Sequence, residues 1–436
     1  MSFKNCLVND IIKDASMIQN NFDYQILHQK YTFQTNIKQN AWKIINQKKI
    51  DQSTFDGILL TYLVKNKIID SYSDLNYYAN HYPVITNFNR LIKYDLSDRR
   101  IQLLHNNSDS PFIPLLILDW IILNNNHHYY YQIKINGIVL SFNVWWNCKL
   151  TEYQQKLLIH QTSLAVYILL FLNNISGKTT RKKQINLNYF ATPFEKQIIE
   201  ENNPKLDEYL KLAGNYYQNI GFKYNLKKIQ NTISTINVNG GMTNHSENLI
   251  VIWRSEEFIK VLIHELVHYF RLEKIKLPNL VEYFNINISN TYPSFPNETI
   301  TELQTFYLFY VYLTVVNKLS KIKLISMIEH EQKYQISKIR QLLDHNRIKS
   351  FDMIWDNSDP KNTINLNCSF IYYYVIKALV LSDINLTVYK LVKPLYDCSN
   401  DHYIMELIHH IYKCHNQLSF DTNIRCNSSL KMSIFG

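Results

Sequence analysis

The chain has 436 residues, of which 46% are hydrophobic, and a formal net charge of +10. This length exceeds that of one compact core, since domains usually hold roughly 100–200 residues, and the apolar content excludes a largely disordered chain. The basic residues are scattered and their densest run, Arg181–Lys183, is short, so the composition does not favour a nucleic-acid-binding protein. The cysteines form no C-x-x-C pair, which is typical of a protein in a reducing compartment.

No segment predicts secretion or membrane insertion. The first twenty residues contain no continuous apolar stretch followed by a cleavage site. The most apolar runs, Phe112–Leu123 and Ser163–Leu172, are shorter than the roughly 20 residues that span a bilayer, so we expect both to be buried. The sequence therefore predicts a soluble, intracellular protein without a membrane span.

The first predicted elements follow an N-terminal region, residues 1–130, to which the sequence assigns no role. Tyr129–Trp146 alternates apolar and polar residues around Asn136-Gly137, which predicts a β-hairpin with a two-residue turn. The next predicted elements are a helix over Glu152–Leu172, a strand over Gln184–Phe190 and a helix over Phe194–Ile220.

The central part of the chain predicts two short strands and a long helix. The strands are Thr232–Val238 and the buried Asn248–Trp253, with Asn239-Gly240-Gly241 as a turn between them. The helix should begin after Ser255 as its N-cap, with Glu256 and Glu257 in its first turn, and run at least through His268.

The remaining chain is predicted to be mainly helical. Helical periodicity is present in Glu298–Lys318, Lys333–His345 and Phe370–Ser382. We therefore expect an α+β protein with three parts: the N-terminal region 1–130, an α/β unit over residues 131–275 that ends in the central helix, and a mainly helical unit over residues 276–436.

The central helix contains a His-Glu-x-x-His motif. His264 and His268 are four residues apart, so they lie on one face of the helix, and two neutral imidazoles placed in this way can bind one Zn²⁺ ion. Glu265 is offset by one position and can reach a water on the same metal as a general base. The motif predicts one zinc ion per chain and peptide hydrolysis.

A third ligand is needed because catalytic zinc usually takes three protein ligands and one water. Glu298 and Glu302 are four residues apart at the start of a predicted helix. We expect Glu298 to complete the metal site and Glu302 to accept the outer N–H of His264 or His268, which would fix the imidazole tautomer. The reverse assignment of Glu298 and Glu302 stays open, and Glu282 is a further candidate.

These residues resemble the thermolysin-like zinc peptidases, or gluzincins, in which H-E-x-x-H is followed by a glutamate ligand on a later helix. The resemblance implies a zincin-like fold with His264, His268 and Glu298 as metal ligands, Glu265 as base and Glu302 behind the ligands. The chain between His268 and Glu298 is longer than is common in that family, and its prolines fit a looped insert over Ile275–Pro296.

The stretch also resembles predicted metallopeptidases of large DNA viruses. The matching features are Ile252-Trp253-Arg254, the helix through His268, the later Glu298 and Glu302, and the segment Tyr373–Lys377. The resemblance covers about a third of the chain, and the Asn- and Lys-rich composition agrees with it. It implies a location in the host cytoplasm or in the virion.

Hydrolysis needs a further donor to the developing oxyanion. Tyr373, with Tyr372 and Tyr374 beside it, is the expected catalytic donor, and His245 is an alternative. The partner should be a peptide or protein substrate, which could pair with the strand around Asn237–Thr243. The competing interpretation is a non-catalytic zinc-containing structural or virion-associated protein, although the presence of Glu265 favours an enzyme.

Overall fold

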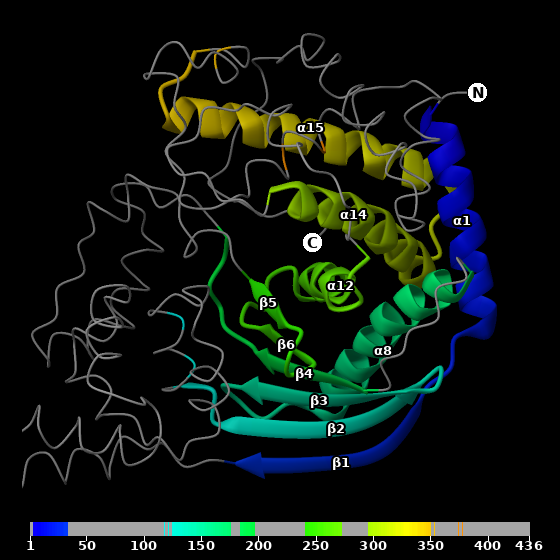
Figure 1. Cartoon of the computed structure of the whole chain (residues 1–436), viewed down its shortest axis with the longest axis vertical. Coiled ribbons are helices and arrows are strands. Elements are labelled where there is room, and N and C mark those ends of the chain that lie inside the picture. Colours follow the sequence, from blue (N-terminus) through cyan, green and yellow to red (C-terminus); the bar gives the residue numbers. More distant parts are fainter. Residues whose placement is uncertain are drawn as a thin grey trace, which may run out of the picture.

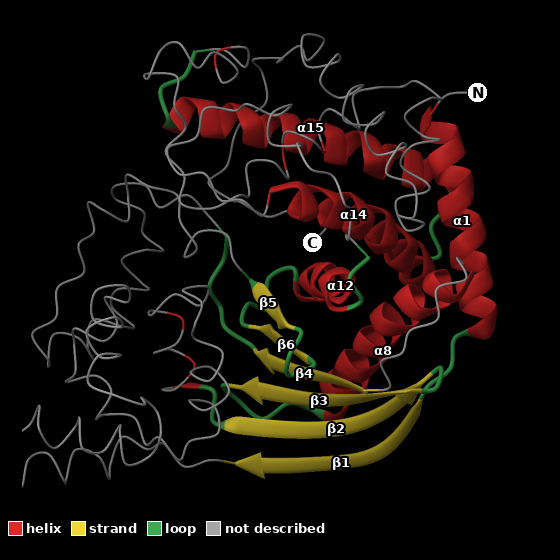
Figure 2. Ribbon diagram, in the orientation of Figure 1, coloured by secondary structure: helices red, strands yellow, loops and turns green. Residues whose placement is uncertain are grey.

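The computed structural model describes residues 3–33, 124–175, 184–196, 240–272 and 295–349, together with the single residues 117, 121, 353, 374 and 377. These residues form a six-stranded mixed sheet and five helices, and the helices lie on one side of the sheet (Figures 1 and 2). The described part of the chain therefore has the mixed helix and strand content that the sequence predicts.

The sheet has the strand order β1-β2-β3-β4-β6-β5. The strands are β1 (Gln25–Phe33), β2 (His127–Ile135), β3 (Ile138–Trp146), β4 (Gln184–Phe190), β5 (Gly241–Asn244) and β6 (Leu249–Ile252). β1, β2 and β3 are antiparallel neighbours, β3, β4 and β6 run parallel, and β5 is antiparallel to β6. The short strand β5 thus ends the sheet on the side of β6.

The predicted hairpin is confirmed. Asn136 and Gly137 join β2 to β3 with φ angles of 44° and 82°, the positive values that a two-residue turn of this hand requires. The strands predicted over Gln184–Phe190 and Asn248–Trp253 are also confirmed, as β4 and β6. β6 is buried along its whole length, as expected for a strand in the parallel part of a covered sheet.

The described part of the N-terminal region belongs to the same sheet and core. The expected boundary after residue 130 falls inside β2, and β1 pairs with β2 along most of its length. Helix α1 (Phe3–Asn21) packs against α14 and α15, and the Tyr307 hydroxyl donates a buried hydrogen bond of 2.5 Å to Asp14 Oδ2.

The other helices stack outward from the sheet. They are α8 (Glu152–Ile175), α12 (Phe258–Tyr269), α14 (Phe295–Asn317) and α15 (Lys321–His345). α12 contacts β5, β6, α8 and α14, so it lies between the sheet and α14 (Figure 1). Buried residues lie on every face of α12. Its polar side chains must therefore find their hydrogen-bond partners inside the protein.

Among the described helices, α8 is the one that could cross a membrane by length and composition, over Glu152–Leu172. The core helix of a soluble protein passes the same test. α8 contacts β2, α1, α12 and α14, and its residues from Leu164 to Leu170 are buried. It is therefore a core helix, as the sequence predicted for Ser163–Leu172.

The predicted start of α12 is wrong. The helix begins at Phe258, and Glu257 precedes it with a left-handed φ of 56° and no side-chain cap. The Ser255 hydroxyl instead donates to the Thr192 carbonyl at 2.5 Å, and Glu256 accepts the Lys196 backbone N–H at 2.5 Å. Thr192 and Lys196, in the segment after β4, thus bind the side chains that the sequence pattern assigned to the N-terminus of the helix.

The same segment corrects the beginning of another predicted helix. Residues 191–196 follow β4 without helical structure, so the helix expected from Phe194 does not begin there. The rest of that helix and the strand expected over Thr232–Val238 lie outside the described residues. The last two residues of the expected loop, Phe295 and Pro296, belong to α14, because proline is tolerated in the first turn of a helix.

Candidate metal centre

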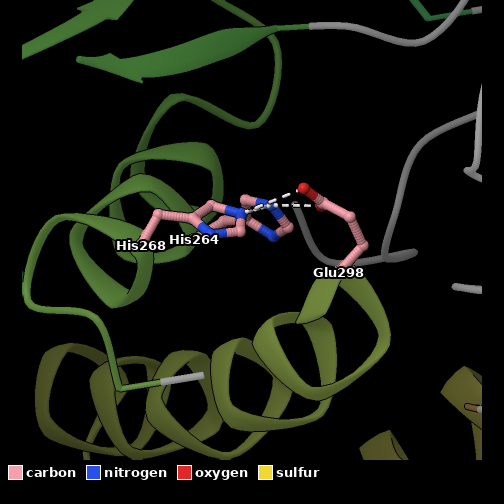
Figure 3. A group of neighbouring side chains, drawn as sticks. All are labelled: His264, His268 and Glu298. Carbon is pink, nitrogen blue, oxygen red and sulfur yellow. Dashed lines mark hydrogen bonds and ion pairs between the residues drawn. The ribbon is translucent and has the colours of Figure 1, made fainter. Parts of the chain in front are cut away.

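Two helices bring the candidate ligands together. His264 and His268 lie one turn apart on α12, and Glu298 lies in the first turn of α14, which packs against α12. The three side chains point toward one another across the gap between the two helices (Figure 3). Their exposed fractions are 8%, 16% and 23%, so the group is largely enclosed but remains reachable from outside.

The ligand atoms have the spacing of a metal site. His264 Nε2 lies 3.2 Å from His268 Nε2, and each of these nitrogens lies 3.4 Å from an oxygen of Glu298. Ligand atoms at about 2.0–2.1 Å from a tetrahedral ion lie about 3.3–3.4 Å apart. His264, His268 and Glu298 also form a group of possible metal ligands whose atoms all lie within 4.8 Å of one another.

The donor set fits a divalent cation on chemical grounds. Two imidazole nitrogens and a carboxylate are the ligands that catalytic zinc takes in proteins with a His₂Glu site. Carboxylate oxygens and unprotonated imidazole nitrogens are all acceptors, so their convergence within 3.4 Å is favourable when a cation lies between them.

Glu265 lies beside this group and is held by β5. The Thr243 hydroxyl lies 2.8 Å from Glu265 Oε2 and 2.9 Å from the Glu265 carbonyl oxygen. Burial raises the pKa of the Glu265 carboxyl, while His264, His268 and the Thr243 hydroxyl act in the opposite direction. A buried carboxyl with a raised pKa next to a candidate metal site is suited to accepting and returning a proton.

The ion pairs of the ligand group shift the pKa values of its members. Burial alone would lower the pKa of His264, but the nearby carboxylates of Glu298 and Glu302 outweigh it and raise that pKa. Burial would raise the pKa of Glu298, but His268 and His264 outweigh it and hold that pKa well below its usual range. In the metal-free group, the charged forms of His264 and Glu298 thus stabilise each other, and a metal ion would displace the ring proton.

Glu302 lies beside His264. Its Oε2 atom is 3.5 Å from His264 Nδ1, an ion-pair distance, so the carboxylate faces the outer ring nitrogen, and the expected hydrogen bond to it stays a prediction. Burial would raise the pKa of Glu302, but Lys260 and Lys377 outweigh it and hold the carboxyl ionised. An ionised carboxylate at this position can accept the Nδ1–H of the ring.

The remaining predicted site residues are not all described. Tyr373, Tyr372 and Glu282 lie outside the described residues, so the oxyanion donor stays a prediction. Tyr374 is described and is buried, and burial raises its pKa well above the usual value. His245 lies in the turn between β5 and β6.

Several residues of the site were missed by the sequence-based predictions. Lys260 and Lys377 bind Glu302, Thr243 binds Glu265, and Gly241 lets β5 approach α12. The signal for Lys260 was present, because a lysine in an apolar helix four residues before His264 has to lie on the same buried face. The sequence placed Thr243 in the strand Asn237–Thr243 and Lys377 in the segment Tyr373–Lys377, but no local pattern indicates their contacts with Glu265 and Glu302.

Comparisons with protein-family models, curated proteins and solved structures found no match to this chain.

Proposed function

We propose that this chain is a zinc-dependent peptidase with one zinc ion per chain. The observation that supports it most is the convergence of His264, His268 and Glu298 at 3.2–3.4 Å, with Glu265 on the same helix turn. The donor set and its spacing favour zinc over calcium or magnesium, which prefer all-oxygen sites.

The reaction follows from the residues around the ligand group. A zinc ion held by His264, His268 and Glu298 would lower the pKa of a bound water and polarise the substrate carbonyl. Glu265, on α12, accepts the proton of the attacking water, and the hydrogen bond from Thr243 on β5 fixes the position of its carboxylate. Glu265 then delivers that proton to the amine that leaves when the peptide bond breaks.

The place of β5 supports a peptide as substrate. β5 is the last strand of the described sheet, it contacts α12, and it holds Glu265 through Thr243. An extended peptide that pairs with such a strand would run past the catalytic carboxylate. A mixed sheet with this strand beside the motif helix, and a later helix that bears Glu298, also agrees with a zincin-like fold.

The test measures metal content and hydrolysis in matched variants. The wild-type protein should bind about one zinc ion per chain and cleave fluorescein-labelled casein or a mixture of quenched fluorescent peptides. His264→Ala should lose the zinc, whereas Glu265→Gln should keep the zinc and lose hydrolysis by a factor of about 10² or more.

Two outcomes would redirect the proposal. In the first outcome, the wild type and Glu265→Gln both bind zinc and neither hydrolyses a peptide. This result would favour the non-catalytic zinc-containing structural protein. A wild-type protein that binds no zinc after refolding with the metal would refute the peptidase proposal itself.

A further inference from the structure

Four buried charged side chains lie behind the candidate ligands, and we call them the buried charge cluster: Lys260, Glu302, Glu331 and Lys377. Each is at most 1% exposed. Lys260 lies on α12, Glu302 on α14 and Glu331 on α15, and Lys377 follows α15 in the chain. The cluster contains two positive and two negative groups, so its formal charges balance.

The contacts of Glu302 are divided between its two oxygens. Lys260 Nζ lies 2.8 Å from Oε1, and Lys377 Nζ forms an ion pair with the same Oε1 atom. Oε2 is the atom that faces His264 Nδ1, at 3.5 Å. Two ammonium groups on one oxygen therefore fix the rotation of the carboxylate and turn its second oxygen toward the imidazole.

This orientation has a consequence for the metal-binding nitrogen. A carboxylate that accepts from Nδ1 selects the tautomer with hydrogen on Nδ1, so the Nε2 lone pair points toward His268 and Glu298. Lys377 also lies 3.8 Å from Glu331, which links this arrangement to α15. The ring orientation of His264 thus depends on residues that never touch the metal.

We propose that Lys260 and Lys377 are positioning residues of the metal centre, which hold Glu302 so that it orients His264 for metal binding. This inference rests on the proposed zinc site. It gives the two lysines a role beyond charge balance, and it makes metal affinity depend on a residue that follows α15 in the chain.

The experiment compares Lys260→Met and Lys377→Met with a matched control, Lys196→Met. Lys196 forms another buried ion pair near α12, with Glu257 at 3.1 Å, and both side chains are at most 1% exposed. Zinc affinity is measured by competition with a chromogenic chelator, the visible spectrum is recorded with Co²⁺ in place of zinc, and the melting temperature of the metal-free protein reports folding.

We expect Lys260→Met and Lys377→Met to weaken zinc binding about 10- to 100-fold and to change the Co²⁺ spectrum, as losses behind a metal ligand usually do. Lys196→Met should lower the melting temperature but leave the zinc affinity within about twofold, because its ion pair does not include Glu302. Equal zinc affinity in all three variants, or an equal loss in all three, would overturn the proposal.

A further variant covers the case in which a single lysine variant does not fold. Replacing Lys260, Glu302, Glu331 and Lys377 together by Met removes the buried charges as a balanced set, which often leaves stability unchanged. This variant should fold and still bind zinc about 10- to 100-fold more weakly, and wild-type affinity in it would overturn the proposal. A wild-type protein without zinc binding would instead show that the proposed function itself has failed.

Discussion

Gly241 is a residue at which β5 lies close to the motif helix α12. A Cβ atom at this position would lie 2.8 Å from Val261 Cγ1, 2.9 Å from Glu265 Cγ and 3.0 Å from Glu265 Oε1. Contacts this short force something to move, and the Glu265 side chain is among the nearest groups. The absence of a side chain at Gly241 therefore allows the strand to lie against Glu265, the proposed general base.

We predict that Gly241→Ala lowers kcat about 10- to 100-fold without loss of zinc, because an added methyl group displaces the Glu265 carboxylate while His264 and His268 stay in place. Steady-state hydrolysis and metal analysis on the same preparation check this. Gly137→Ala is the control: Gly137 has a φ of 82° with open space around it, so its replacement should cost about 1 kcal/mol of stability and leave kcat unchanged. Full activity in Gly241→Ala would contradict the close contact.

Thr243 supplies the second prediction at this scale. Its hydroxyl stabilises the ionised form of Glu265 and so lowers a pKa that burial raises. Thr243→Val removes this effect, and the Glu265 pKa should rise further. Because the ionised base is needed, the acidic limb of the kcat/KM profile should move to higher pH. Thr243→Ser should keep the wild-type profile, and an unshifted limb in Thr243→Val would contradict the assignment.

The helices α12 and α14 place one carboxylate on each side of His264. Glu298 faces the Nε2 atoms of both histidines, whereas Glu302 faces only the outer nitrogen of His264. We therefore predict that Glu298→Ala loses zinc almost completely, while Glu302→Ala retains it with an affinity about 10- to 100-fold lower. Chelator competition measures both values. The opposite order of the two variants would make Glu302 the ligand.

The elements that the sequence predicted best are those with a local cause. Asn136-Gly137 specifies the hairpin turn through its own backbone preferences, and His264 and His268 share a face because of helix geometry alone. The start of α12 was missed because Thr192 and Lys196, distant in the sequence, bind Ser255 and the two glutamates. Because tertiary contacts determine where α12 begins, the local sequence pattern could not predict this boundary.

The candidate site shows the same division. The spacing of the motif on α12 predicts two ligands, but the choice of a remote carboxylate depends on how α14 packs. Of the two described candidates, Glu298 and Glu302, it is Glu298 that brings both oxygens to the histidines. The contact of Lys377 with Glu302 was out of reach for the same reason. Lys377 meets α14 only through the folded arrangement of α12, α14 and α15.

At the scale of the whole molecule, the site joins parts of the chain that are far apart in sequence. β5 supplies Thr243, α12 and α14 supply the candidate ligands, and Lys377 closes the cluster behind them. Since this arrangement exists only in the folded chain, zinc should bind the native state far more strongly than the unfolded state and raise its stability.

The pH dependence of this stabilisation has a definite sign. The raised pKa of His264 means that its protonated ring stabilises the metal-free fold below about pH 6.5, the usual histidine value, and that this contribution is lost as the pH rises through the folded-state pKa. Zinc requires the unprotonated ring. At the proposed site, protons and zinc would therefore compete for the same nitrogen.

We predict that the melting temperature gained on adding equimolar zinc is larger at about pH 8 than at about pH 6. Each pH unit below the His264 pKa should weaken zinc binding by about tenfold, or about 1.4 kcal/mol, for the one proton displaced. Thermal melts with and without zinc at three pH values and constant ionic strength measure the difference. Glu265→Gln should show the same pH trend, because Glu265 is not among the candidate ligands, and a gain that does not vary with pH would mean that zinc does not bind through His264.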